Sequence, residues 1–198
     1  MNLLIPMFFF SLAMSISPGP VNMVIVSSGV NYGIKKTMPY VSGATIGFTL
    51  LLLFIGLGFF QVINAFPFFL KYLSFGGSLF IMYMGYKVAS SKPNIEVNKE
   101  GRTPKFFEGF LLQWLNPKAW IACVSGASIF SSTESYTPFL TFTSIYFLVC
   151  YASLALWAVL GDKVSFLLNS HFRLRFFNLL MGLLLILTAG YLCYTNLV

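Results

Sequence analysis

Residues 1–34 read MNLLIPMFFFSLAMSISPGPVNMVIVSSGVNYGI and contain no charged side chain. An apolar run of about 20 residues is long enough to cross the roughly 30 Å hydrocarbon core of a bilayer as a helix. The segment Ser17-Pro18-Gly19-Pro20 lies inside this run, and its prolines remove backbone N–H donors from the helix. The sequence therefore predicts a membrane helix that is broken partway along.

The rest of the chain has the same apolar character. Hydrophobic residues make up 58% of the 198 residues and charged residues 9%, against about 25% charged in a soluble domain. The formal net charge of +7 comes mostly from residues between the apolar runs, so we assign it to membrane orientation rather than to nucleic-acid binding. We predict an all-α membrane protein that has the lipid bilayer as its environment and no nucleic-acid partner.

Further apolar runs can be counted as membrane spans. Residues 37–70, 135–161 and 176–198 carry no charge, and two other stretches each tolerate one interior lysine, Lys71 or Lys118. We expect six transmembrane helices, at about residues 4–28, 38–60, 66–88, 107–131, 137–160 and 176–196. Together they would form a single transmembrane domain over residues 1–198.

The charges between the expected helices alternate from one connection to the next. Every lysine and arginine except Lys71 and Lys118 lies in the first, third or fifth connection. Basic residues mark the cytoplasmic side of a membrane protein, so these connections are predicted to be cytoplasmic and both termini to lie outside. No basic residue precedes the first apolar run, which favours a retained helix over a cleaved signal peptide.

A polar linker, residues 89–106, divides the expected helices into two sets of three, residues 1–88 and 107–198. Because three is odd, a duplicated unit would be inserted the second time with inverted topology. Two spacings recur: Pro20 with Ser28-Gly29 matches Pro117 with Ser125-Gly126, and Gly77 with Gly85-Tyr86 matches Gly182 with Gly190-Tyr191. The sequence thus predicts two inverted three-helix repeats.

The break in the first helix is expected to face the protein interior. Pro18 and Pro20 leave nearby carbonyls without helical partners, Gly19 adds flexibility, and Asn22 adds a polar side chain. Irregular backbone at membrane depth is tolerated where it is buried in protein or lines a water-filled cavity. A proline kink used only for packing is the alternative that stays open.

The fourth expected helix carries polar residues at an equivalent depth, namely Gln113, Asn116, Pro117 and Lys118. A lysine at the centre of a membrane helix costs about 2.5–3.5 kcal/mol, so it usually faces a cavity or a partner. No acidic residue is expected at this depth, and a carboxylate from a ligand would balance the charge. Alternatively, the side chain extends to the headgroups, or its ammonium binds carbonyls freed by Pro117.

Two further features complete the predicted site. Gln113, Asn116 or Pro117, and Trp120 have the spacing of one helix face, which suits a small polar molecule held by amides beside an aromatic wall. Hydrogen bonding between helices explains the same residues equally well. Asp162, near the cytoplasmic end of the fifth helix, is a candidate proton-coupling carboxylate, and pairing with Lys163 is its alternative.

Residues that carry catalysis, metals or disulfides are scarce. His171 is the one histidine, and Cys123, Cys150 and Cys193 lie in apolar runs without a C-x-x-C spacing. A phosphate-binding loop of the form G-x-x-x-x-G-K-[ST] is also absent from the sequence. We therefore expect no enzyme activity, no cofactor, no metal site and no ATP-driven step.

Three motifs stand out together: Ser17-Pro18-Gly19-Pro20-Val21-Asn22, Tyr83-Met84-Gly85-Tyr86-Lys87 and Asn116-Pro117-Lys118-Ala119. The whole chain resembles the LysE/RhtB family of amino-acid exporters. The resemblance covers the three motifs, the order of the motifs and the length of the chain. Residues 43–53 and 109–130 look most similar to the cysteine/O-acetylserine exporter branch. The resemblance implies a multi-pass protein of the bacterial inner membrane that exports small amino acids or their derivatives, with a proton as the expected coupling ion.

One departure from the family pattern bears on the substrate. Lysine-exporting relatives tend to carry an aspartate in the second helix after a pair of glycines, whereas this chain has Gly47-Phe48-Thr49 there. The departure favours neutral substrates of the cysteine/O-acetylserine or homoserine/threonine type over cationic ones. The oligomeric state is left open, with a homo-oligomer as one option.

The leading hypothesis is a secondary exporter in which the two broken helices meet near the midplane and one three-helix unit rocks against the other. Lys118 and backbone donors around Gly19 and Pro20 would contact the substrate carboxylate. The side chains that would orient the rest of the substrate are Asn22, Gln113 and Asn116.

Two alternatives belong to other functional classes. A membrane thiol-redox electron carrier would need paired cysteines in the first and fourth helices, and the first helix has none. A metal-ion exporter would need carboxylates, imidazoles or thiolates at the midplane, where this chain places a cation.

Overall fold

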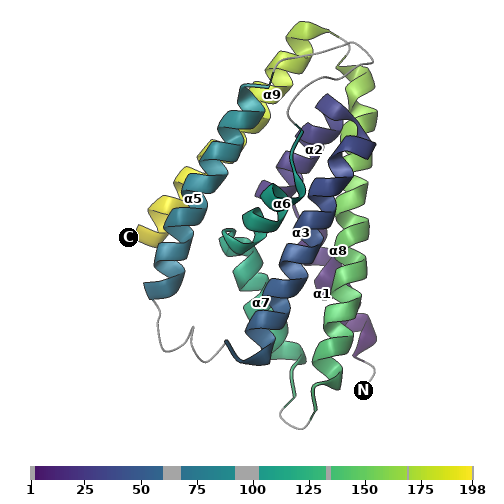
Figure 1. The fold of residues 1–198 in the computed structure, drawn as a ribbon, viewed down its shortest axis with the longest axis vertical. Coiled ribbons are helices and arrows are strands. Elements are labelled where there is room, and N and C mark those ends of the chain that lie inside the picture. The colour runs from purple at the N-terminus through teal and green to yellow at the C-terminus, as the bar shows by residue number, and fades with distance from the viewer. Residues whose placement is uncertain (1–2, 60–67, 92–102, 133–134, 169, 198) are drawn as a thin grey trace.

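The computed structural model describes residues 3–59, 68–91, 103–132, 135–168 and 170–197 (Figure 1). Within these ranges every regular element is a helix, so the predicted all-α class is confirmed. In chain order the elements are α1 (Leu4–Ile16), α2 (Pro20–Tyr32), α3 (Ile34–Phe54), the π-helical η1 (Ile55–Phe59), α5 (Phe68–Ala89), α6 (Phe106–Trp114), α7 (Pro117–Phe130), α8 (Thr137–Val164), the 3-10 helix η2 (Ser165–Leu167) and α9 (His171–Leu197).

Several of these helices have the length and composition of membrane spans. Within the described residues the stretches Ile34–Gly58, Thr137–Leu167 and His171–Tyr194 qualify singly. α1 and α2 qualify together, as a pair bent by 61°. The fourth expected helix is divided into α6, with 9 residues, and α7, with 14 residues, each too short to span a bilayer alone. The described residues therefore contain three candidate spans, or four with the bent pair.

The ends of the helices alternate between the two ends of the molecule (Figure 1). The α2–α3 junction, the end of α5 and the α8–α9 junction lie at the upper end of the figure, and α6 begins below them. The start of α1, the end of α7 and the start of α8 lie at the opposite end. The upper segments carry basic residues such as Lys35, Lys87 and Arg175, whereas residues 92–102 of the linker and the 60–67 stretch lie outside the described residues.

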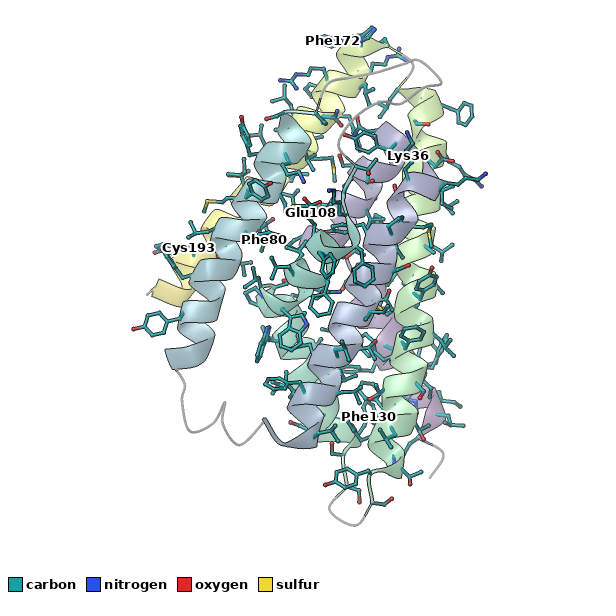
Figure 2. All side chains as sticks on the ribbon, in the orientation of Figure 1. Lys36, Phe80, Glu108, Phe130, Phe172 and Cys193 are labelled. Atoms are coloured by element: carbon teal, nitrogen blue, oxygen red, sulfur yellow. The ribbon has the colours of Figure 1, made fainter. Side chains whose placement is uncertain are left out.

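α5 and α9 lie side by side as a pair that leans away from the other helices (Figure 1). Gly85 and Gly182 allow this close approach, because a β-carbon on either would press against the carbonyl oxygen of the other. The buried side chains of Asn31 and Asn178 tie α9 to α2, each donating from Nδ2 to the other's Oδ1, at 2.7 and 2.9 Å. Phe172 points away from the bundle near the start of α9 (Figure 2).

The remaining helices pack around α3 and α8. Gly43 of α3 lies against the backbone of Phe106 in α6, and Gly161 of α8 lies against the backbone of Val26 in α2. A side chain at either glycine would separate the helices, since the space for a β-carbon is already taken by a carbonyl group. At the basic end, Lys87 and Glu108 form an ion pair of 2.6 Å that joins α5 to α6; Figure 2 labels Glu108.

The glycine spacings that recur in the sequence do not lead to equivalent surroundings. A β-carbon at Gly29 would meet the backbone of Ala158, whereas one at the matching Gly126 would meet the ring of Phe142. Gly85 is packed against α9, but its counterpart Gly190 faces open space. These matches therefore give the predicted repeat no support from packing.

Candidate functional site

The break between α1 and α2 removes the normal donors of four carbonyl groups. In a continuous helix the N–H groups of residues 18–21 would bond to the carbonyls of residues 14–17. Pro18 and Pro20 have no N–H, and the chain leaves the helical conformation at Ser17 and Gly19. Carbonyls this deep in an apolar protein need other donors.

Four side chains provide those donors. The hydroxyl of Ser17 donates to the carbonyl of Met14 at 3.2 Å, Asn22 Nδ2 to that of Ser15 at 3.0 Å, Trp157 Nε1 to that of Ile16 at 3.3 Å, and Lys118 Nζ to that of Ser17 at 2.8 Å. Two of the four, Trp157 and Lys118, belong to other helices. The first break is therefore completed by α7 and α8.

Lys118 makes the largest contribution to this arrangement. Its ammonium also donates to Ser17 Oγ at 2.8 Å and to the carbonyl of Pro18 at 3.4 Å. Gly19 leaves room for the lysine side chain, because a β-carbon there would lie 3.3 Å from both Lys118 Cδ and Nζ. No carboxylate of the described residues lies within ion-pair distance of this ammonium.

The structure thus distinguishes between the expectations for Lys118. The side chain does not extend along its own helix to the headgroups but reaches across to the other break. The alternative in which the ammonium binds carbonyls freed by Pro117 is not observed either, although the ammonium does bind carbonyls freed by a break. Those carbonyls belong to Ser17 and Pro18 rather than to the break at Pro117.

The break between α6 and α7 is closed by its own residues. Asn116 caps the N-terminus of α7, where its Oδ1 accepts from the N–H of Lys118 at 3.2 Å. Pro117 occupies the first helical position, which needs no N–H. Trp120 Nε1 donates to the carbonyl of Trp114, the last residue of α6, at 2.7 Å.

This second break corrects one prediction. Gln113, Asn116 and Trp120 were expected on one helix face, but α6 ends at Trp114 and a new helix begins at Pro117. The indole of Trp120 is used inside the break and forms no wall of the cavity described next. Spacing along a helix has no meaning across a point where the helix stops.

A half-open cavity with about 390 Å³ of empty space lies between the two breaks. Of the predicted site residues, those that line it are Gly19, Asn22, Gln113, Asn116 and Lys118. Pro18, Pro20 and Pro117 are not part of its lining and act by breaking the helices. This volume includes open solvent at the mouth of the cavity.

Backbone donors also belong to the cavity. Gly19, Val21 and Asn22 line it at the N-terminus of α2, and their N–H groups have no acceptor in the described part of the chain. The first N–H groups of a helix lack intrahelical acceptors and carry a partial positive charge. The N–H groups of Gly19, Val21 and Asn22 are thus the candidates for the donors expected around Gly19 and Pro20, since Pro20 has no N–H group.

The sequence reasoning missed the wall of the cavity that α8 forms. Tyr146, Cys150 and Leu154 line it with a spacing of four residues, as one stripe of that helix. Phe48 of α3 stacks on Tyr146, with ring centroids 4.3 Å apart and an interplanar angle of 13°. The spacing of a phenol and a thiol along an apolar helix is the sequence signal of this wall, but ordinary helix packing produces the same spacing.

Asp162 lies away from the cavity. Its carboxylate faces Gly33 at the α2–α3 junction, where a β-carbon would lie 3.2 Å from Asp162 Oδ1. Gly33 has a φ of +80°, a conformation that glycine adopts readily. The expected ion pair between Asp162 and Lys163 is not formed within the described residues, and proton coupling through Asp162 stays a prediction.

The chain is similar to known membrane transport proteins. Residues 12–196 match the family model described as LysE type translocator. The chain is 24% identical to the cysteine/O-acetylserine efflux proteins of Escherichia coli (strain K12) and Shigella sonnei (strain Ss046), over 195 residues covering 98% of each chain. The protein of the same description from Shigella flexneri is 24% identical over 187 residues, 93% of this chain and 94% of the relative. No solved structure is significantly similar.

Proposed function

The chain belongs to the LysE type translocator family, and we propose that it is a secondary-active exporter of small neutral amino acids or their derivatives. The resemblance of its motifs to that family is confirmed, and the family is one of translocators rather than enzymes. The first compounds to test are cysteine and O-acetylserine, because relatives that are 24% identical to this chain are named as efflux proteins for these two compounds.

The observation that carries the proposal is an ammonium beside a cavity that no carboxylate of the described residues neutralises. Lys118 is half-buried, and its partners in the described residues are uncharged. Backbone N–H groups of Gly19, Val21 and Asn22 lie at the same cavity. A carboxylate would be bound by both kinds of donor, as anions are at helix N-termini.

The rest of an amino acid would be bound by the amide side chains. Asn22, Gln113 and Asn116 line the cavity, and amide oxygens accept hydrogen bonds from an α-ammonium group. None of the described residues that line the cavity has a carboxylate for a cationic side chain, which is consistent with the neutral substrates expected from Gly47-Phe48-Thr49. The proposed substrate is therefore a neutral zwitterion.

The contacts of Lys118 suggest how binding is linked to movement. In the structure, its ammonium holds the first break to the second through Ser17 and Pro18. A bound carboxylate would compete for the same ammonium and weaken that connection. A ligand shifts a conformational equilibrium when it binds one of the two states more tightly than the other.

The membrane arrangement is part of the same proposal. We place six spans in the bilayer, with residues 1–88 and 107–198 as inverted repeats, the basic ends in the cytoplasm and both termini outside. The alternation of helix ends in Figure 1 supports this arrangement. Export would proceed across the bacterial inner membrane by alternating access and would be coupled to protons.

Efflux from proteoliposomes tests the proposal. Vesicles containing the purified protein would be loaded with labelled cysteine, O-acetylserine, homoserine or threonine, and efflux measured with and without a proton gradient. We expect Lys118→Met to lower efflux about tenfold or more, because it removes a charge-assisted hydrogen bond.

The matched control is Lys163→Met, which removes an exposed lysine at the end of α8. It should transport like the unmodified protein. Equal efflux from Lys118→Met and Lys163→Met, at equal amounts of folded protein, would show that Lys118 does not bind the substrate. Absence of efflux of all four compounds from the unmodified protein would overturn the proposed function.

A further inference from the structure

A second cavity lies between α2 and α5, toward the end of the molecule that carries the basic residues. It is half open and has about 330 Å³ of empty space, a volume that includes open solvent at its mouth. Of the described residues that line it, Lys87 of α5 alone is charged. None of these residues also lines the cavity between the two helix breaks. The molecule therefore has two separate cavities.

The two cavities are close to each other. α2 borders both, with Asn22 lining the first and Val24 lining the second. α6 connects them as well, since Glu108 contacts Lys87 of the second cavity and Gln113 lines the first. Five residues separate Glu108 from Gln113, which corresponds to about 7.5 Å along the axis of a helix. A molecule in the second cavity is thus a short distance from the first.

An ion pair lies at the second cavity. Lys87 Nζ is 2.6 Å from Glu108 Oε1, and the two side chains are only 19% and 14% exposed. Removing both charges from water costs free energy that their attraction returns only in part, so the pair is weak evidence of a stabilising role. A better attested role of such pairs is to switch between two arrangements.

Each member of the pair has a further contact that does not depend on the other. Glu108 Oε2 accepts from the backbone N–H of Lys105 at 2.9 Å, in the first turn of α6, where the helix dipole favours a carboxylate. The Lys87 ammonium lies 5.6 Å from the centre of the Tyr83 ring, a cation–π contact within α5. The two charges can therefore separate without losing all of their contacts.

The uncharged polar side chains of the cavity wall already have partners. Ser28 Oγ lies 2.8 Å from Thr37 Oγ1, and Asn31 Nδ2 donates to Asn178 Oδ1 at 2.7 Å. These bonds complete this part of the wall without a ligand. The two charges, rather than these hydroxyl and amide groups, are therefore the features that would select a ligand.

A zwitterion carries the two charges that a separated ion pair needs. The carboxylate and the ammonium of an α-amino acid are attached to the same carbon atom, so they can reach two groups that are neighbours. The carboxylate would bind Lys87 and the ammonium would bind Glu108, so that one ion pair becomes two. An acid without an amine, or an amine without a carboxylate, would leave Glu108 or Lys87 without a charged partner.

We propose that the second cavity is an entry site, at which a zwitterionic α-amino acid takes the place of the contact between Lys87 and Glu108 before it reaches the cavity at Lys118. The site rests on the proposed function, because it assumes that amino acids enter from the basic end. Binding there would separate α5 from α6, since the ion pair joins these two helices. The entry site would admit α-amino acids and exclude simple acids and amines of similar size.

Equilibrium binding of labelled cysteine, kept reduced, to the purified full-length protein tests the entry site. We expect two bound molecules per chain in the unmodified protein, and Lys118→Met should remove one of them. Lys87→Met and Glu108→Gln should each weaken binding of the other molecule about tenfold or more, because each removes one of its two charge-assisted contacts.

Analogues of cysteine that lack one charge test the recognition of a zwitterion. They would be added to the Lys118→Met variant, in which we expect the entry site to be the one that binds. The first, 3-mercaptopropionate, lacks the ammonium, and the second, cysteamine, lacks the carboxylate. Each should compete with labelled cysteine about tenfold less well than unlabelled cysteine does. Equal competition by either analogue would overturn the proposed recognition.

Two controls separate binding from a structural role of the ion pair. Lys35→Met removes an exposed lysine of α3 at the same end and should leave both bound molecules in place. Lys87→Met combined with Glu108→Leu replaces the pair with apolar side chains, so α5 and α6 should stay packed without the charges. This double variant should unfold like the unmodified protein and bind one molecule. Two bound molecules would mean that the ion pair is only structural.

The outcomes separate the entry site from the function on which it rests. Efflux from an unmodified protein that binds fewer than two molecules would overturn the entry site and leave the exporter intact. Two bound molecules that the Lys87 and Glu108 variants leave unchanged would do the same. Absence of both binding and efflux would overturn the proposed function itself.

Discussion

The break between α1 and α2 takes two of its four replacement donors from other helices, whereas the break between α6 and α7 is completed by neighbours in sequence. At the first break, Lys118 and Trp157 come from more than one hundred residues away to bind the carbonyls of Ser17 and Ile16. At the second, Asn116 and Trp120 bind groups within six residues of themselves. The same interruption of a helix is thus stabilised in two different ways.

This difference assigns the two breaks different tasks. A self-contained break keeps its shape when other helices move, so the α6–α7 break can hold Lys118 at a constant position. The α1–α2 break is maintained by contacts between helices, and those contacts change when helices shift. We therefore expect substrate binding to reorganise the first break and to leave the second unchanged.

The largest expected effect is on local opening of the first break. Lys118→Met removes the donor of the Ser17 and Pro18 carbonyls. Amide hydrogen exchange of residues 13–23 should rise about tenfold or more, since a hydrogen bond lost to a charged donor lowers the local opening free energy by about 1.5–3 kcal/mol. Exchange in residues 111–120 should stay within about twofold, and equal increases in both segments would contradict the comparison.

A smaller loss is expected from Asn22→Leu. The buried Nδ2 of Asn22 is the donor to the Ser15 carbonyl at 3.0 Å, and leucine has a similar volume but no donor. Leaving that carbonyl unpaired should lower the free energy of unfolding by about 1–3 kcal/mol. Thermal unfolding in detergent micelles measures the change, and a midpoint equal to that of the unmodified protein would show that the bond does not stabilise the break.

At the second break, Asn116→Ala should cost about 1 kcal/mol of stability, the usual effect of losing an N-cap side chain. Asn116→Asp is the matched control, because a carboxylate oxygen can accept from the N–H of Lys118 in the same way. The two variants would be compared by their unfolding midpoints. Equal losses from Asn116→Ala and Asn116→Asp would show that the cap does not stabilise the second break.

The smallest expected effects come from the two indoles. Trp157→Phe removes an exposed hydrogen bond of 3.3 Å to Ile16, and Trp120→Phe removes a partly buried one of 2.7 Å to Trp114. We expect stability losses of about 0.5 kcal/mol and about 1 kcal/mol respectively. Unfolding midpoints would rank the pair, and a larger loss from Trp157→Phe would reverse the order that bond length and exposure predict.

Much of the site could be predicted because it depends on chemistry within a few residues. Pro18, Pro20 and Pro117 interrupt helices wherever those helices pack, so the two breaks followed from the sequence. A lysine in an apolar run needs polar surroundings, so Lys118 was expected at the cavity that it lines.

The wall formed by Tyr146 and Cys150 could not be distinguished in this way. Both residues lie in a long apolar helix whose every face carries similar side chains. A stripe at a spacing of four residues is also what ordinary helix packing produces. Only contact with Phe48 and Ser15 makes this stripe part of the cavity.

By itself, the sequence determined the all-α class, the points at which two helices are interrupted, and the residues that leave or lack backbone hydrogen bonds there. Tertiary structure alone decided which distant partners satisfy those groups: the ammonium of Lys118 for the carbonyl of Ser17 and the indole of Trp157 for that of Ile16. The physical reason is that a missing backbone donor is a property of the local chain, whereas its replacement depends on which distant side chain the packing of helices brings within about 3 Å.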